Sequence, residues 1–468
     1  MLLINLPYLE RVYSGLKQAV AIQPPLGLAY IAAYLREHGV SAEIIDANAL
    51  EMQMPQLVKV AAASQHQFVG VTCTTNTIYL AYEFATKLKA ISPEKKVVLG
   101  GVHVTFADED TLKECPAIDF VVRGEGELTT LKLVSESNLG QINGLTYRDS
   151  NGAIKRNPDA TLIMDLNQLP FPARDLLPID KYRPGTLFNI GQKGSKYMTI
   201  LSSRGCPNKC VFCSSAYFWH YLRIRSPENI IAEIDFLHEK YGVKHLHFLD
   251  DTLTVPKARM EKVCDLLIER NYGIEWNTFS RADIVDEALL SKMRKAGCYG
   301  ITFGVESGNE DILRRIRKNV TKEQVRTAVN TAKKIGLDTH CDFMLGLPDD
   351  DEKTMQDTID FAIELDPNVA LFSITTPFPG TDLFYELKTK GVIQNTGWGN
   401  ASLHEASNIG NGKVDAATIR KYYNRAYSSF YYRPKYALNA ILRLSKHPRE
   451  IAPFALGMLY KLTENKRE

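Results

Sequence analysis

Hydrophobic positions in the first part of the chain form short apolar runs separated by amphipathic stretches. Residues 2–6, 42–46, 68–73, 96–99 and 119–122 are nearly continuous apolar runs, as expected of strands buried on both faces. Residues 25–38, 57–64 and 78–91 carry apolar side chains at helical spacing. This alternation predicts an α/β fold with a doubly wound, Rossmann-like parallel sheet over residues 1–143.

Residues 144–195 break the alternation. Asp149, Asn151 and Gly152 are typical of a hairpin turn. Pro170 and Pro172 exclude a helix around them. We interpret 144–195 as a hairpin followed by a linker.

A second alternating series occupies residues 196–381. Its predicted strands are 197–202, 245–249, 275–279, 300–305, 339–345 and 371–375, and its predicted helices are 229–241, 258–271, 287–296, 322–335 and 352–364. Six such units are fewer than the eight of a full barrel, so they predict a partial (βα)6 barrel with its chemistry at the carboxyl ends of the strands. Residues 382–468 are predicted to form a helical C-terminal region.

Composition narrows the class of protein. The net charge is +2 over 468 residues, which makes nucleic acid an unfavoured partner. No apolar run reaches the roughly 18 residues of a membrane span, and the N-terminus lacks the pattern of a secretion signal, so a cytoplasmic location is expected. Three of the eight cysteines cluster while the others are scattered, which indicates a thiolate site rather than a disulfide framework.

The clustered cysteines are Cys206, Cys210 and Cys213, in a Gly- and Pro-containing segment after the first strand of the second series. Soft sulfur ligands select iron–sulfur clusters or zinc. Three local thiolates on a four-iron cluster would leave one iron open for an exogenous ligand. The alternative is a closed structural zinc site, with His220 as a candidate fourth ligand.

The C-x3-C-x2-C spacing, with Phe212 before the last cysteine, resembles the radical S-adenosylmethionine (SAM) superfamily. The resemblance implies that the open iron of a [4Fe-4S] cluster binds SAM, which is reductively cleaved to a 5′-deoxyadenosyl radical. It also implies that Phe212 lies near the adenine and that an electron donor such as flavodoxin or ferredoxin is a partner.

Polar or glycine residues at the later strand ends fit the same resemblance. Asp250 and Asp251 correspond to a segment near the methionine amino group, and Arg281 is a candidate for its carboxylate. Glu306 is a candidate acceptor for substrate or cofactor hydroxyls, and the backbone at Gly346 a candidate neighbour of the adenine. For any single one of these residues, a structural ion pair or turn is the alternative.

The strand ends of the N-terminal sheet are rich in glycine and hydroxyl side chains, and none matches a dinucleotide or P-loop motif. Joined to the radical domain, they make residues 1–400 resemble the cobalamin-dependent radical SAM enzymes. The chain lacks the histidine motif that ligates cobalt in other cobalamin domains, which is usual for that family. The residues that the resemblance assigns to cobalamin are Thr72, Thr74, Thr75, Asn76, Gly100, Gly101, His103, Thr105, Gly124 and Glu125. A backbone-bonded turn histidine is the alternative for His103, and a degenerate domain without cobalamin is the alternative for the whole sheet.

The expected activity is methylation of an unactivated carbon of a small-molecule or lipid substrate. Cyclisation or rearrangement by the same family is the alternative. A cobalamin sensor would leave the cysteine triplet unused, and an iron–sulfur electron carrier would need a fourth local ligand. A methylthiotransferase acting on tRNA normally carries three further N-terminal cysteines, whereas this region holds only Cys73 and Cys115.

The C-terminal region combines basic and aromatic residues. Residues 418–449 contain no Asp or Glu, and Ile419, Tyr422, Tyr423, Ala426 and Phe430 follow helical spacing. A helix that packs this stripe on the barrel is one interpretation. Peripheral contact with an anionic membrane, or with an anionic substrate, is the other.

Overall fold

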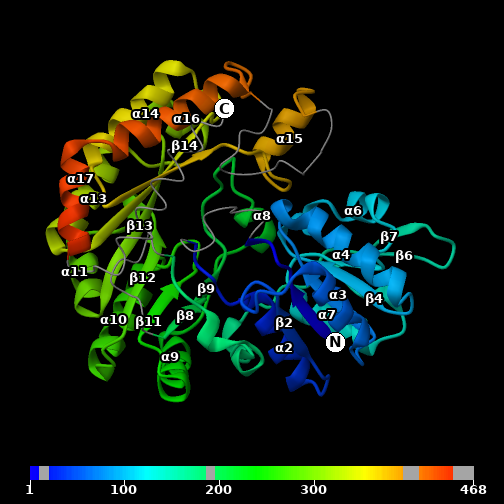
Figure 1. Cartoon of the computed structure of the whole chain (residues 1–468). Coiled ribbons are helices and arrows are strands. Elements are labelled where there is room, and N and C mark those ends of the chain that lie inside the picture. Colours follow the sequence, from blue (N-terminus) through cyan, green and yellow to red (C-terminus); the bar gives the residue numbers. More distant parts are fainter. Residues whose placement is uncertain (10–19, 186–195, 394–409, 446–468) are drawn as a thin grey trace.

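A computed structural model describes residues 1–9, 20–185, 196–393 and 410–445. Two α/β units lie side by side, and the last two described helices lie along the outer side of the second unit (Figure 1). The predicted fold class is confirmed.

The first unit is a seven-stranded sheet in the order β2-β1-β3-β4-β5-β6-β7. Neighbours from β2 to β5 pair in parallel, and β6 and β7 add an antiparallel hairpin beside β5. The predicted hairpin therefore extends the N-terminal sheet. The strands are β1 (Leu2–Asn5), β2 (Glu43–Asp46), β3 (Phe68–Thr72), β4 (Lys96–Gly100), β5 (Phe120–Val122), β6 (Leu145–Arg148) and β7 (Ile154–Arg156).

Helices cover both faces of this sheet. One buried cluster joins the strands to α3 (Met54–Ala63), α4 (Ile78–Ile91) and α6 (Asp108–Glu114), and a second joins them to α2 (Leu26–Glu37) and α7 (Gly126–Ser135). Between β4 and α6, the structure forms the short helix α5 (Val102–Phe106), where the sequence indicated only a turn. The turn into it depends on Gly101, whose φ is +108°, because a Cβ there would lie 2.3 Å from the carbonyl oxygen of Cys73.

The second unit is a six-stranded parallel sheet in the order β15-β14-β13-β12-β11-β8. Its two outermost strands do not pair with each other, which is the predicted open barrel. The strands are β8 (Tyr197–Ile200), β11 (His245–Phe248), β12 (Glu275–Ser280), β13 (Cys298–Glu306), β14 (Asp338–Leu345) and β15 (Val369–Ile374). The outer helices are α9 (Pro227–Tyr241), α10 (Lys257–Arg270), α11 (Glu287–Lys295), α12 (Glu310–Arg315), α13 (Lys322–Ile335) and α14 (Glu352–Leu365).

The linker is anchored by a buried ion network. Arg174 donates to Glu233 of α9 at 2.8 Å and to the carbonyl of Thr199 at 2.7 Å. Glu233 also accepts from Arg225, and all three side chains are at most 4% exposed. These three buried charged side chains stabilise one another, because a buried charge without a partner lowers the stability of the folded state.

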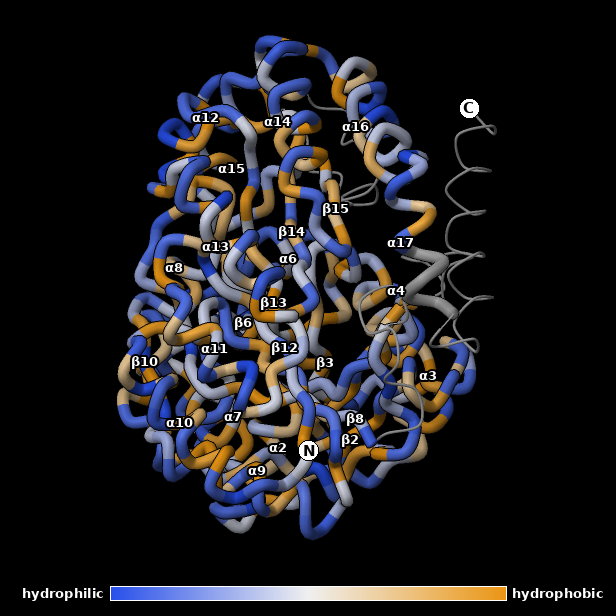
Figure 2. Tube along the Cα trace, turned by 90° about the vertical axis from the view of Figure 1, so that its left-hand side faces the viewer, coloured by the Kyte–Doolittle hydropathy of each residue, from blue (hydrophilic) through white to orange (hydrophobic). Residues whose placement is uncertain are grey.

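The C-terminal region contains α15 (Asp382–Thr389), α16 (Ala416–Tyr431) and α17 (Pro434–Ser445). Hydrophobic and hydrophilic stretches alternate along the helical tubes (Figure 2). In α16 the predicted stripe of Ile419, Tyr422, Tyr423, Ala426 and Phe430 is buried in the barrel core. The packing interpretation of this stripe is therefore confirmed.

The hydroxyls of two further α16 residues bond to the backbone of the edge strand β15. Tyr427 donates to the carbonyl of Phe372 and accepts from its amide, and Tyr431 does the same at Ala370. Tyrosines four residues apart on a helix thereby match backbone groups two residues apart on a strand, because both spacings are roughly 6–7 Å.

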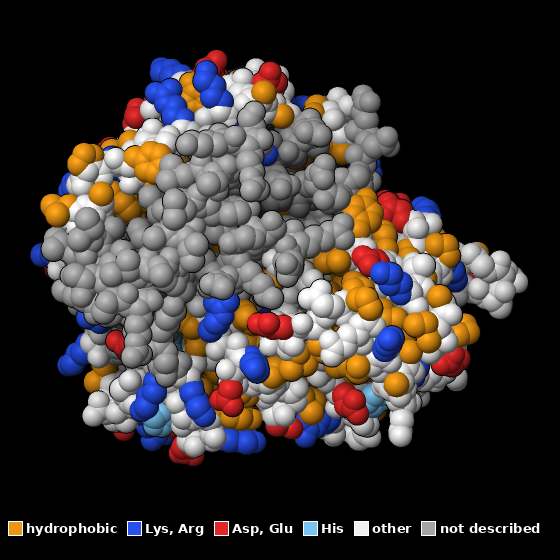
Figure 3. All heavy atoms as spheres, in the orientation of Figure 1, with side chains coloured by type: hydrophobic (Ala, Val, Ile, Leu, Met, Phe, Trp, Pro, Cys, Tyr) orange, Lys and Arg blue, Asp and Glu red, His pale blue; other side chains and the backbone are white. Residues whose placement is uncertain are grey.

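The surface in Figure 3 mixes Lys and Arg with Asp, Glu and hydrophobic side chains. Among the described residues, no helix has both the length and the hydropathy needed to cross a membrane. Membrane contact through the C-terminal region stays a prediction.

Candidate active site

The three clustered cysteines lie on the loop between β9 (Ser203–Arg204) and α8 (Ser215–Trp219). The loop is fixed on two sides, since the amide of Val211 donates to Ile316 and its carbonyl accepts from Leu383 of α15. Gly205 begins the loop with φ +93°, and a Cβ there would lie 2.5 Å from the carbonyl oxygen of Tyr221. Glycine at this position thus lets the loop turn tightly toward the barrel mouth.

The thiols are close enough to affect each other's ionisation. Burial, reinforced by the charges of Asp251, Cys210 and Cys206, raises the pKa of Cys213 to about 12. Burial also raises the pKa of Cys210, while the Lys318 ammonium opposes that shift. No three His, Cys, Asp or Glu side chains of the described segments converge as they would around one metal ion. A cubane cluster instead takes each thiolate on a separate iron.

Asp250 and Asp251 differ in their surroundings. Asp250 is fully buried and accepts from the amide and hydroxyl of Ser202, at 3.1 and 2.7 Å, and from the hydroxyl of Ser203. It therefore fixes the segment that leads into the cysteine loop. Asp251 is exposed and bonds to Ser215 at the start of α8. The role of either carboxylate toward SAM stays a prediction.

A buried charge cluster lies inside the barrel next to the cysteine loop. Lys318 donates to Glu306 at 2.7 Å, and each side chain is 9% exposed. Glu306 has φ +69° at a register shift between β13 and β14. Gly304 makes room for the pair, because a Cβ there would lie 2.6 Å from the Glu306 carboxylate and 2.9 Å from Lys318 Nζ.

Two more groups complete this cluster. Arg281 donates to Asp283 through Nε and Nη2, each at 2.9 Å, and to the carbonyl of Lys318 at 2.6 Å. Burial, reinforced by the charge of Glu306, raises the pKa of Asp342 to about 7. Sequence reasoning missed Lys318 and Asp342. Residues 341–345 of β14 are apolar except for Asp342, and this single carboxylate was the signal that could have identified it.

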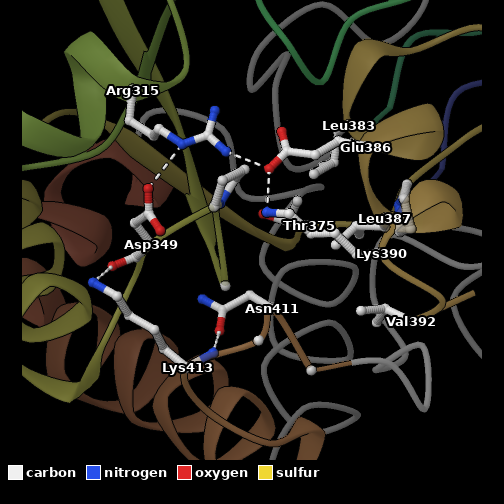
Figure 4. Close-up of a pocket in the computed structure, with 15 residues that line it drawn as sticks. Arg315, Asp349, Thr375, Leu383, Glu386, Leu387, Lys390, Val392, Asn411 and Lys413 are labelled. Carbon is white, nitrogen blue, oxygen red and sulfur yellow. Dashed lines mark hydrogen bonds and ion pairs between the residues drawn. The ribbon is translucent and has the colours of Figure 1, made fainter.

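Gly346 and Phe212 lie where the sequence predicted, at the end of β14 and on the cysteine loop. Gly346 lines a cavity of about 260 Å³ that also includes Pro348 and Thr375 (Figure 4). Arg315 there bridges Asp349 and Glu386, at 2.8 and 2.6 Å. Phe212 is half-buried and packs against the barrel core. The wall of this cavity combines leucine and proline side chains with the charged side chains of Arg315, Asp349, Glu386, Lys390 and Lys413, so a role toward the adenine stays a prediction.

The strand ends of the N-terminal sheet form a second cavity, of about 250 Å³. Five of the residues predicted to bind cobalamin line it, namely Thr72, Gly100, Gly101, Gly124 and Glu125. Leu201, Arg204, Phe218 and Trp219 of the second unit also line it, so the two units share this cavity.

The other predicted cobalamin residues lie outside the cavity lining. His103 is buried, its Nδ1 lies 3.1 Å from the hydroxyl of Thr75, and burial lowers its pKa to about 4, so the imidazole is neutral. Thr105 accepts from the amide of Gly124 and donates to the carbonyl of Gly101. Thr74 caps the turn that contains Asn76. These contacts brace the turns, and a role toward cobalamin stays a prediction for each.

Glu125 makes contacts that the sequence did not suggest. One carboxylate oxygen accepts from Arg204 at 2.6 Å, and the other accepts from Arg223 at 2.8 Å and from the amide of Ile163 at 3.0 Å. Glu127 accepts from the second terminal nitrogen of Arg204 at 2.5 Å. The carboxylate of Glu125 thus lines the cavity while bonded to the cluster-bearing unit.

Two family models match the chain. The model of the radical SAM superfamily matches residues 200–362, and the model of the B12 binding domain matches residues 16–134. An uncharacterized methyltransferase, PH0819 of Pyrococcus horikoshii, is 38% identical over 448 residues, which cover 94% of each chain. The chain belongs to the cobalamin-dependent radical SAM enzymes. The expected [4Fe-4S] cluster, SAM and cobalamin are thereby confirmed as the cofactors of its family.

Other members of this family are more distant. The anaerobic magnesium-protoporphyrin IX monomethyl ester cyclase of Rubrivivax gelatinosus is 32% identical over 81% of this chain and 69% of its own. The solved structure of the radical SAM methyltransferase TsrM from Kitasatospora setae has a TM-score of 0.66 at 18% identity, covering 84% of this chain and 75% of that one. The apo structure of the radical enzyme OxsB has a TM-score of 0.70 at 18% identity, covering 98% and 70%. At these identities the two structures show the shared fold.

Proposed function

We propose that this enzyme methylates an unactivated carbon atom of a small-molecule or lipid substrate. The observation that carries the proposal is the cavity at the N-terminal strand ends, whose wall includes Arg204, two residues before the first cluster cysteine. This arrangement would bring the proposed cobalamin and cluster sites to the same interface. The 38% identity to a protein named as a methyltransferase, over 94% of the chain, supports the methyl-transfer outcome.

The residues present fit the cofactors. Cys206, Cys210 and Cys213 would hold the cluster on a loop that Gly205 turns tightly. Glycines at the N-terminal strand ends leave backbone open to a large ligand, and a cavity of about 250 Å³ would take one part of cobalamin. When bound, the cluster supplies the electron that cleaves SAM, and cobalamin carries the methyl group.

The chain's own residues position the reacting groups and exclude water. We propose that Arg281, Glu306, Lys318 and Asp342 surround the methionine and ribose parts of SAM, and that Phe212 and the backbone at Gly346 lie at its adenine. The buried Glu306–Lys318 pair presents both a hydrogen-bond acceptor and donors from one point. The ribose hydroxyls of SAM need hydrogen-bond acceptors, and its carboxylate needs donors.

The overall reaction fixes what must be measured. One substrate C–H bond, two SAM and two electrons give one methylated product, one S-adenosylhomocysteine, one 5′-deoxyadenosine and one methionine. An electron donor such as flavodoxin or ferredoxin would supply both electrons. Cyclisation is the second candidate, favoured by the 32% identity to a cyclase. It would form 5′-deoxyadenosine without a matching amount of S-adenosylhomocysteine.

The test uses the full-length chain, purified and reconstituted without oxygen, with reductant, SAM and hydroxocobalamin. The expected result is about four irons per chain and formation of 5′-deoxyadenosine. Cys213→Ala should lose both. Cys264→Ala, which changes a buried cysteine of α10, should keep both and serves as the control. A protein that binds no corrin, or forms no 5′-deoxyadenosine, would contradict the proposal.

A further inference from the structure

The contact between the two units includes four charged side chains, which we call the interdomain clasp: Glu125, Glu127, Arg204 and Arg223. Each is at most 5% exposed, and the two positive charges balance the two negative ones. Arg204 uses both terminal nitrogens, one on each carboxylate. A planar guanidinium can bridge two carboxylates in this way, whereas an ammonium group cannot reproduce the fork.

Arg204 is also held between two aromatic rings. Its guanidinium carbon lies 5.3 Å from the ring centroid of Tyr30 in α2 and 5.5 Å from that of Trp219 in α8. One ring belongs to the N-terminal unit and the other follows the cluster loop. The guanidinium is therefore fixed by both units in position as well as in charge.

The clasp is continuous with the cluster loop. Arg204 pairs with Arg223 across the antiparallel ribbon of β9 and β10 (Arg223–Ile224), and Cys206 follows only two residues later. On its other side, the preceding Ser202 and Ser203 are bonded to the buried Asp250. The entry to the cluster loop is thus tied to the barrel by Asp250 and to the N-terminal unit by Arg204.

The clasp also forms part of the wall of the N-terminal cavity. Glu125, Glu127, Arg204, Tyr30 and Trp219 all line it, together with the glycine-rich strand ends. A ligand seated in the cavity would lie against the side chain that precedes the cluster cysteines. An ordinary structural ion pair at an interface would not need to share its residues with both sites.

We infer that Arg204 is a positioning residue that couples occupancy of the cobalamin cavity to the conformation of the cluster loop. This inference rests on the proposed function, because it requires cobalamin to bind in that cavity. Coupling between two sites is reciprocal, so a cluster that orders the loop must tighten cobalamin binding by the same factor by which cobalamin tightens binding of the cluster. Arg204 transmits the effect because it is rigidly bonded on both sides.

The test measures the dissociation constant of hydroxocobalamin for the full-length chain with and without its cluster. Couplings of this kind are usually 5- to 150-fold, so the cluster should tighten binding by about fivefold or more in the wild-type chain. Arg204→Lys should bring the ratio of the two constants to about one, since lysine cannot bridge both carboxylates. Glu127→Gln, which removes one ionic arm only, should lower the ratio partway.

Arg174→Lys is the matched control. Like Arg204, Arg174 is a buried arginine bonded to a glutamate. It does not line the N-terminal cavity, and it lies outside the cluster loop. A purely structural loss would shift both dissociation constants equally, so Arg174→Lys should keep the wild-type ratio. Hydrogen exchange of residues 203–219 should also slow on cobalamin addition in wild-type and Arg174→Lys protein, but not in Arg204→Lys.

Three outcomes would overturn the inference. A wild-type ratio near one would show that the sites are not coupled. An undiminished ratio in both Arg204→Lys and Glu127→Gln would show that the coupling does not pass through the clasp. If the wild-type protein bound no cobalamin with or without its cluster, that result would contradict the proposed function and, with it, the inference.

Discussion

The Glu306–Lys318 pair shows how one glycine and one irregular backbone position create a site. The register shift after Gly304 turns Glu306 toward Lys318, and the missing Cβ at Gly304 leaves the space that both side chains occupy. A residue with φ +69° that is not glycine is strained, and such strain is retained where the surroundings fix it. The strain at Glu306 therefore agrees with a functional position.

Removing Lys318 should lower the stability of the folded chain. Lys318→Met leaves the Glu306 carboxylate buried without its cation, which should lower the free energy of unfolding by about 3–5 kcal/mol. The double variant Lys318→Met/Glu306→Gln should recover most of that loss, because no buried charge is left alone. Chemical denaturation of the cluster-free chain measures the free energy of unfolding of the single and the double variant. A double variant as unstable as the single one would contradict an ion-pair explanation.

Asp342 should give the stability a specific pH dependence. Its pKa is raised from 3.8 to about 7 by burial and by Glu306, so between these values the folded chain holds a proton that the unfolded chain has lost. Its contribution is therefore fully present below about pH 4 and is lost as the pH rises through about 7. Asp342→Asn should flatten this fall, measured as the difference between denaturation at pH 5 and pH 8. Equal slopes in wild type and variant would refute the assignment.

Local chemistry could be predicted from sequence where the participating residues are neighbours in the chain. The cysteines lie within one short loop, so the sequence itself indicated a thiolate site, and the resemblance of its spacing to the radical SAM superfamily implied the cluster. Glu125 and Arg204 lie 79 residues apart, and no local pattern shows that the carboxylate bonds to the second unit. Lys318 was missed for the same reason, because the irregular backbone at Glu306 that brings the two together has no sequence signature.

At the scale of elements, α16 is an aromatic helix whose tyrosine hydroxyls bond to the backbone of the edge strand β15. A strand at the end of an open sheet exposes unpaired amides and carbonyls. Tyr427 and Tyr431 satisfy these groups on β15 through their hydroxyls, while their rings pack on the barrel. The sequence predicted the stripe and its helical spacing, but the hydroxyl contacts depend on how the helix lies along β15.

Tyr427→Phe should therefore be destabilising despite the near-identical shape. It removes the partner of both backbone groups of Phe372, a residue that is itself fully buried. A buried backbone group left unsatisfied costs about 1–3 kcal/mol. Tyr432→Phe, at a neighbouring residue that is 47% exposed, should change stability by less than about 0.5 kcal/mol. Equal effects in thermal unfolding would contradict this account of α16.

At the scale of the whole molecule, the two α/β units were evident from the alternation of apolar runs, and their sheet types followed from strands buried on both faces. The orientation of the two units relative to each other could not be predicted from the sequence, because it depends on a few side chains scattered along the chain. The clasp is one such contact. Another joins α5 of the first unit to the loop before α15, where a Cβ on Gly380 would lie 2.2 Å from the ring of Phe106.

This contact provides a test of how closely the units must approach. Gly380 has φ +83° and Gly391 has φ +70°, but nothing lies within 4 Å of a Cβ at Gly391. Alanine at either position should cost about 1 kcal/mol for the left-handed backbone. Only Gly380→Ala should add a further cost, of about 1–3 kcal/mol, for forcing Phe106 and its helix away.

A double-mutant cycle isolates that second cost, because Phe106→Ala removes the ring that the new Cβ would meet. In the Phe106→Ala background, Gly380→Ala should cost no more than Gly391→Ala does in the wild-type chain, as followed by thermal unfolding. For the proposed methylation, separation of the units should also lower the yield of methylated product relative to 5′-deoxyadenosine, since radical formation would need the barrel alone whereas methyl transfer would need both units aligned. If Gly380→Ala lowered both yields equally, the contact would stabilise the barrel without setting the alignment of the two units.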